Sequence, residues 1–135
     1  MDKNELEKLI VDSPFHKLLG LRLIEFDEEA GTLELEMPFN PAVERGHNSG
    51  QFHGGIIASF IDIAGDYAVS LKLGFGVPTI NFRTDYLRPA FNTSLRARAS
   101  IRRVGRTVGV ADVDVFDDED RLVAIGRGCY GTKQG

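Results

Sequence analysis

The sequence predicts an α+β fold in which an antiparallel sheet of about five or six strands wraps around one long central helix. Residues 56–71 are apolar around most of a helical circumference, which is typical of a buried helix. Two strand-like segments precede this helix and four follow it. Several of them alternate apolar and polar residues, as strands do when one face is buried. A curved sheet with one apolar face would bury both its own apolar surface and that of the helix.

Turn residues delimit the predicted elements. Within residues 95–102 apolar side chains at odd positions alternate with polar ones at even positions, which indicates one buried face. Val108 and Val110 are out of phase with Val113 and Val115, which predicts a bulge or a sharp twist. The predicted strands are residues 21–26, 32–37, 79–88, 93–103, 106–116 and 121–130, and short helices are predicted at 3–10 and 15–19.

Composition limits the class of protein. The 135 residues suit a single domain, 1–135, and a net charge of −4 argues against general nucleic-acid binding. The lone Cys129 excludes an internal disulfide and suits a reducing compartment. No apolar signal segment follows Met1, and the central helix is too short and too charged to cross a membrane. We therefore expect a cytoplasmic protein without membrane partners.

The central helix carries one narrow polar stripe, defined here as Ser59, Asp62, Asp66 and Ser70. At 100° per residue these side chains lie within about 60° of one another. The stripe either faces water or lines a pocket in which one carboxylate does chemistry. Two carboxylates spaced i and i+4 repel each other, so at least one should have a raised pKa if the stripe is partly dry.

The entry to the helix is His53-Gly54-Gly55. The first backbone N–H groups of a helix have no intrahelical acceptor, and together with the helix dipole they can bind an anion or a developing oxyanion. Gly54 and Gly55 would let a ligand approach these amides closely. Alternatively, the two glycines only permit a tight turn and close packing.

Two segments resemble a known family. The first is Gly50-Gln51-Phe52-His53-Gly54-Gly55 with Asp62 eight residues after Gly54, and the second is residues 78–90. Together they resemble the hotdog-fold acyl-CoA thioesterases of the 4-hydroxybenzoyl-CoA thioesterase superfamily, of the phenylacetate-pathway type, over about residues 14–131. The resemblance implies the hotdog fold and hydrolysis of an acyl-CoA thioester to a free acid and CoA.

By this resemblance Asp62 is the general base or the nucleophile, and the Gly54 amide is the oxyanion donor. Thr79 corresponds to a family position that holds the water or the carboxylate. Asp66 is either a second charge that raises the pKa of Asp62 or a solvated side chain.

Three further residues near the helix entry are candidates. The family commonly has an asparagine six residues before His53; here that position is His47, and Asn48 follows it. Either side chain could hold the thioester carbonyl or orient a water. His53 has a catalytic role or is a structural histidine hydrogen-bonded to backbone.

Binding of CoA requires partners for its phosphates. Arg88, Arg102, Arg103 and Arg106 are candidates because guanidinium groups bind phosphate bidentately, although arginines at strand ends can simply be solvated. Several aromatic and aliphatic residues could line an aryl or medium-chain acyl pocket, namely Phe39, Phe52, Phe75, Phe82 and Leu87. The histidines and Cys129 lack zinc-like spacing, so we expect no metal and no cofactor beyond the CoA of the substrate.

The chemistry predicts an oligomer. Asp62 and Gly54 are separated by about 12 Å along one helix, whereas both must lie within about 3 Å of the reacting atoms. Two antiparallel copies of the helix across a twofold axis can bring Asp62 of one chain to Gly54 of the other. We therefore expect a homodimer, which the family commonly pairs into a homotetramer.

Two other functions are compatible with the same fold. One is a non-catalytic module that binds acyl-CoA, and the other is a hotdog enoyl-CoA hydratase. Hydratases of this fold usually carry a different Asp/His pair, which is not found at matching positions in this sequence.

Overall fold

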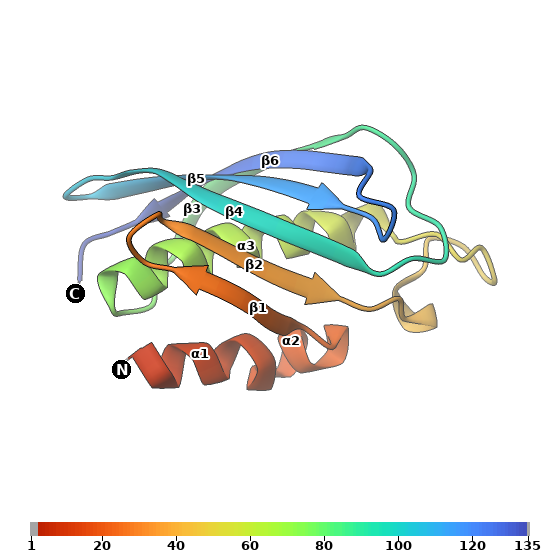
Figure 1. The fold of residues 1–135 in the computed structure, drawn as a ribbon, viewed down its shortest axis with the longest axis horizontal. Coiled ribbons are helices and arrows are strands. Elements are labelled where there is room, and N and C mark those ends of the chain that lie inside the picture. The colour runs from red at the N-terminus through yellow and green to blue at the C-terminus, as the bar shows by residue number, and fades with distance from the viewer. Residues whose placement is uncertain (1–2, 135) are drawn as a thin grey trace.

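A computed structural model describes residues 3–134 and shows one long helix, α3 (Gly54–Leu73), against the concave face of a six-stranded sheet (Figure 1). The strand order is β1-β2-β4-β5-β6-β3, and every neighbouring pair is antiparallel. The predicted α+β architecture is therefore confirmed. The strands are β1 (Arg22–Asp27), β2 (Thr32–Met37), β3 (Thr79–Tyr86), β4 (Leu95–Val104), β5 (Val108–Phe116) and β6 (Leu122–Gly131).

Two short helices precede the sheet. α1 (Lys3–Asp12) and α2 (Pro14–Leu19) lie along the β1 side of the molecule, and α1 also contacts α3 (Figure 1). Pro14 begins α2 and Gly20 ends it in the left-handed conformation, as the sequence indicates. A 3₁₀ turn, η1 (Pro41–Val43), lies in the long connection to α3. Across residues 3–134 no helix combines the length and apolarity that a membrane span requires.

α3 is longer than predicted by two residues at each end. Its N-cap is His53, whose side chain accepts a hydrogen bond from the Gly55 amide. Its C-cap is Gly74, at φ 88°, and the Gly74 amide donates to the Ser70 carbonyl. Both caps satisfy backbone groups that an uncapped helix leaves unpaired, which explains the two extra residues at each end.

Small residues let α3 approach the sheet closely. The odd-numbered side chains of β4 face the helix and are fully buried from Leu95 to Ala99, as the alternation predicts. A Cβ on Gly109 of β5 would lie 3.2 Å from Val69 of α3. The fully buried alanines at this contact are Ala64, Ala68, Ala97, Ala99 and Ala111.

The predicted irregularity near Val108 and Val110 is present, but on the neighbouring strand. The register of β4 against β5 shifts between Ile101 and Arg103, so β4 holds the extra residue. β5 keeps its alternation, with Gly109 and Ala111 facing inward. The two valines face outward because the inward positions beside α3 require smaller side chains.

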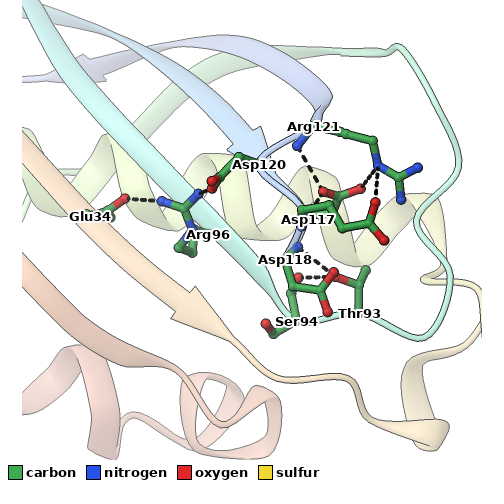
Figure 2. Close-up of polar contacts among 9 residues, drawn as sticks. Glu34, Thr93, Ser94, Arg96, Asp117, Asp118, Asp120 and Arg121 are labelled. Carbon is green, nitrogen blue, oxygen red and sulfur yellow. Dashed lines mark hydrogen bonds and ion pairs between the residues drawn. The ribbon is translucent and has the colours of Figure 1, made fainter.

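Charges alternate in sign across the outer face of the sheet. Arg96 of β4 donates to Glu34 of β2 at 3.0 Å and also pairs with Asp120 (Figure 2). Arg127 of β6 binds Asp112 of β5 at 2.6 Å. Acidic side chains of β2 and β5 thus pair with arginines of β4 and β6 on this face.

Candidate active site

The centre of the site is the carboxylate of Asp62, midway along α3. The Thr79 hydroxyl, at the start of β3, donates to Asp62 Oδ1 at 2.9 Å. The Tyr130 hydroxyl, near the end of β6, donates to the Asp62 backbone carbonyl at 3.1 Å. One predicted pair, Asp62 and Thr79, is therefore brought into contact.

Both carboxyls of the polar stripe titrate abnormally. Burial raises the pKa of Asp62, and the Thr79 hydroxyl bond opposes this shift. Burial, together with the nearby Asp62 charge, raises the pKa of Asp66 to about 7 against the opposing Ser70 bond. Within residues 3–134 neither carboxylate has a basic ion-pair partner. The predicted raised pKa is confirmed. Neither interpretation of Asp66 holds: its carboxyl is largely buried and bonded to Ser70 instead of solvated, and its charge is not among the causes that raise the pKa of Asp62.

A cavity of about 340 Å³ lies beside these carboxyls, between α3 and the two N-terminal helices. His16 contributes to its wall and is held by a contact of Nδ1 with the Leu9 carbonyl at 3.0 Å and by its edge against the Tyr67 ring. The cavity therefore places the carboxyls of Asp62 and Asp66 beside an apolar surface. Its apolar lining consists of Leu6, Leu9, Ile63, Tyr67 and Val77.

At the entry to α3, one backbone amide remains free. His53 Nδ1 accepts the Gly55 amide at 2.8 Å, and the His53 carbonyl accepts the Ile56 amide at 3.0 Å. The Gly54 amide has no acceptor among residues 3–134. Since its Nδ1 accepts a hydrogen bond, neutral His53 carries its proton on Nε2. His53 thus caps the helix through a backbone contact, as one of its two interpretations predicted.

A second cavity, of about 580 Å³, adjoins this free amide. The Tyr86 hydroxyl donates to the Gly54 carbonyl at 2.5 Å and holds one wall of the cavity against the helix. Arg45 and Arg88 both line it. Of the residues proposed for an acyl pocket, Phe52 and Leu87 lie here, whereas Phe39, Phe75 and Phe82 line neither cavity.

Other predicted residues lie apart from both cavities. His47 and Asn48 occupy the exposed loop before α3, where the Asn48 amide donates to Glu44 at 2.8 Å. The predicted CoA-binding residues Arg102, Arg103 and Arg106 lie around the β4–β5 hairpin, near the end of α3 opposite to Arg88 (Figure 1). Arg102 is also within 3.6 Å of Asp112.

Three residues of these sites were missed in the sequence. The hydroxyls of Tyr130 and Tyr86 reach α3 from segments distant in the sequence, and Arg45 lines a cavity together with residues 86–91, so no local pattern identifies the three. One indirect signal exists for Tyr130. A glycine inside a helix is destabilising, and Gly65 of α3 is required because a Cβ there would overlap the Tyr130 hydroxyl. The residues that the structure describes contain no cluster of three or more His, Cys, Asp or Glu side chains suited to a metal ion.

Comparison with known proteins decides the family. The sequence model of the thioesterase superfamily matches residues 49–124, more than half of the chain. The chain belongs to the thioesterase superfamily. The predicted hotdog fold and the predicted enzyme class, thioester hydrolase, are thereby confirmed.

Several known proteins match most of the chain. A Halobacterium salinarum protein with a provisional esterase name is 40% identical over 127 residues, covering 85% of this chain and 83% of its own. The acyl-coenzyme A thioesterase PaaI of Escherichia coli is 33% identical over 113 residues, covering 83% and 77%. A crystal structure of a thioesterase-superfamily protein superimposes with a TM-score of 0.87 at 34% identity, covering 95% and 96%.

Proposed function

We propose that this protein is an acyl-CoA thioesterase in which Asp62 of one subunit and the Gly54 amide of a second subunit act on the same thioester. The observation that carries this proposal is the Asp62 carboxylate, which has a raised pKa, a Thr79 donor and a cavity beside it. The acyl-coenzyme A thioesterase PaaI, at 33% identity, supports the substrate class.

The residues are suited to two routes of hydrolysis. As a general base, Asp62 takes a proton from water while the water oxygen attacks the thioester carbonyl carbon. As a nucleophile, Asp62 attacks that carbon itself and forms an anhydride, which water then hydrolyses. In both routes the Gly54 N–H donates to the developing oxyanion, the C–S bond breaks, and the CoA thiolate leaves and is protonated.

The requirement for two subunits follows from the separation of these groups along α3, about 12 Å for eight residues of helix. β3 supports such pairing because it is an edge strand bonded only to β6, with Ile80 and Phe82 exposed by 56% and 39%. Long apolar edge strands tend to pair with another chain. Two β3 strands meeting across a twofold axis would place two α3 helices side by side, with Thr79 and Asp62 at the interface.

We place the acyl group in the cavity beside Asp62, because its lining is mostly apolar and it adjoins the carboxylate. The CoA phosphates are assigned to Arg88, which lines the cavity beside Gly54 together with Arg45. An antiparallel pair of α3 helices would also bring the β4–β5 hairpin of the partner, with its arginines, toward this end. The partner hairpin therefore becomes a second candidate for the phosphates.

The test is release of free thiol from a panel of acyl-CoA and aryl-CoA thioesters by wild type and by Asp62→Asn. We expect hydrolysis by wild type only, with the same elution volume for both proteins on size-exclusion chromatography. Equal rates for the two proteins would overturn the role of Asp62. Tight binding without thiol release would identify an acyl-CoA-binding module. Loss of enoyl-CoA absorbance without thiol release would identify a hydratase.

A further inference from the structure

Three hydrogen bonds link the polar stripe of α3 to the turn that enters β3. Asp62, Asp66 and Ser70 follow each other at spacings of four residues on one face of α3. The Ser70 hydroxyl donates to Asp66 Oδ1 at 3.0 Å, and the same oxygen accepts the Val77 amide at 3.2 Å. Two residues later, Thr79 donates to Asp62. The segment 77–79 is thus bonded back to α3 at both of its ends.

The Ser70 hydroxyl is placed to fix this segment. Ser70 is fully buried and Val77 is 8% exposed, so an unpaired Val77 amide would be costly there. A serine inside a helix often donates to the carbonyl four residues earlier. Ser70 donates instead to the Asp66 side chain, and its oxygen accepts from the Val77 amide. Asp66 therefore sets the direction of the Ser70 hydroxyl.

Besides the packing of Val77 against Val69, Ala111 and Tyr130, few hydrogen bonds hold the turn. Gly74 adopts φ 88° and Gly76 is exposed, so the turn has two residues with high conformational freedom. Besides the Val77 bond, the Gly74 amide donates to the Ser70 carbonyl at 2.8 Å and the Gly131 amide donates to the Pro78 carbonyl at 2.9 Å. Thr79 is also paired with Tyr130 of β6, which fixes it to the sheet. Two of these three bonds end on Ser70, so Ser70 is the hydrogen-bonded link between the turn and α3.

We propose that Ser70 is a positioning residue for thioester hydrolysis: it anchors the turn so that the Thr79 hydroxyl holds the Asp62 carboxylate in one orientation. The inference rests on the proposed function. Ser70 acts through Val77 and Thr79, and Asp66 acts by orienting Ser70. Within the polar stripe, Asp62 is therefore the reacting carboxylate, whereas Asp66 and Ser70 position it.

The test is a double-mutant cycle of Ser70→Ala and Thr79→Val in the thiol-release assay. Ser70→Ala should lower kcat by roughly 10-fold, because small misplacements of a catalytic group are costly, while KM stays within about twofold. The acid limb of its pH–kcat profile should shift in the same direction as in Thr79→Val. The double variant should lose no more activity than Thr79→Val alone, because both changes remove the same interaction. The surrounding titratable groups, His16 on α2, Asp66 and Tyr67 on α3 and Tyr130 on β6, remain in every variant.

Thr93→Ala is the matched control. The Thr93 hydroxyl is 5% exposed, donates to the Ser94 carbonyl at 2.7 Å and accepts the Asp118 amide at 2.9 Å, so it makes the same kind of double contact (Figure 2). It contacts neither stripe carboxyl. Thr93→Ala should therefore lower thermal stability as Ser70→Ala does while keeping kcat within about twofold. Ser70→Cys keeps most of the volume but is a weak acceptor, and it replaces Ser70→Ala if that variant does not fold.

Two results would overturn the inference. One is a Ser70 variant whose kcat matches that of Thr93→Ala, and the other is a double variant whose losses multiply. Asp62→Asn in the same assay separates the two proposals. If Asp62→Asn is inactive and Ser70→Ala is normal, only the positioning role fails. If Asp62→Asn remains active, the proposed function of Asp62 fails first.

Discussion

Two carboxylates of this protein, the buried Asp117 and the partly buried Asp62, differ in their hydrogen-bond donors. Asp117, in the β5–β6 turn, is 2% exposed. It accepts the Glu119 and Arg121 amides, each at 2.9 Å, and the Arg121 guanidinium at 2.8 Å (Figure 2). In contrast, the Asp62 carboxylate has the Thr79 hydroxyl as its hydrogen-bond donor, and no basic side chain in the described chain pairs with it.

The difference in donors reverses the effect of burial on the pKa. Burial acts to raise the pKa of Asp117, but the two amides and the guanidinium together hold it below its usual value. Burial dominates at Asp62 and Asp66, whose pKa values are raised. A buried carboxylate with many donors stabilises a turn, whereas one with few donors stays available to take a proton.

The largest expected effect is on kcat, and the same Asp-to-Asn substitution at Asp62 and at Asp117 distinguishes the two roles. Asp62→Asn should lower kcat by about 10²–10⁴-fold, because a positioned base contributes that much. Asp117→Asn should leave kcat nearly unchanged and lower the free energy of unfolding by about 1–3 kcal/mol, because its donors lose a charged acceptor. Thiol release and urea unfolding of both variants measure this. An active Asp62→Asn, or an inactive Asp117→Asn that is fully folded, would contradict the division.

The next effect concerns the donor to Asp62. Thr79→Val should lower kcat by roughly 10–100-fold, since hydrogen bonds to charged groups contribute about 1.5–3 kcal/mol. The acid limb of the pH–rate profile should move to higher pH, because the Thr79 bond favours the ionised carboxylate. Thr84→Val on the same strand is the control, since the buried Thr84 hydroxyl has no hydrogen-bond partner in the described chain. A Thr79→Val variant indistinguishable from Thr84→Val would remove Thr79 from the site.

A smaller effect is expected at the cavity beside Gly54. Arg88→Gln should raise KM for CoA thioesters by about 10-fold with little change in kcat, because a phosphate interaction that substrate and transition state share equally contributes to binding alone. Arg98→Gln is the control, because it also removes one arginine charge but does so on the outer face of the sheet, where Arg98 lies between Glu34 and Asp114. Equal KM values for the two variants would assign the CoA phosphates elsewhere.

The smallest effect is on stability, with opposite pH dependence at the two sites. The folded-state pKa of Asp66, about 7, exceeds its unfolded value, so its contribution is present below about pH 4 and is lost as pH rises through 7. Asp117 has a lowered pKa, so its contribution is present above about pH 4 and is lost on further acidification.

Asp66→Asn should therefore gain stability relative to wild type between about pH 5 and 8, on the order of 1–2 kcal/mol after allowance for solvent screening. Asp117→Asn should be less stable than wild type at neutral pH, and this difference in stability should disappear as the pH falls below about 4. Thermal unfolding across this pH range tests both variants. Parallel pH profiles for the two variants would mean that the pKa of Asp66 is not raised in the folded protein.

Periodic patterns predicted most of the fold. The apolar circumference of residues 56–71 and the alternation in residues 95–102 depend on local geometry, and both correspond to observed elements. The shifted bulge shows the limit of this approach. Val108 and Val110 face outward because of the space between β5 and α3, and the extra residue lies in β4. Such competition for space cannot be read from one strand.

The candidate site, like the fold, was predicted only in part from the sequence. The spacing of Asp62 and Asp66 predicted a raised pKa, because two residues four apart on a helix are neighbours in any fold. Burial, which the spacing does not reveal, is the main cause of the shift at both carboxyls, and the Asp62 charge adds to it at Asp66. The roles of His53 and Asp66 remained open in the sequence, because they depend on which groups lie opposite each side chain. The structure places His53 on the Gly55 amide and Asp66 on the Ser70 hydroxyl.

The sequence by itself determined one apolar helix with a polar stripe and a glycine entry, because helical periodicity fixes which side chains share a face. Only the tertiary structure decided that Thr79 reaches Asp62, that Ser70 anchors the turn between them and that the Gly54 amide stays free. Those contacts join segments separated along the chain, and their distances follow from how the turn after α3 and the edge strand β3 fold back against the helix.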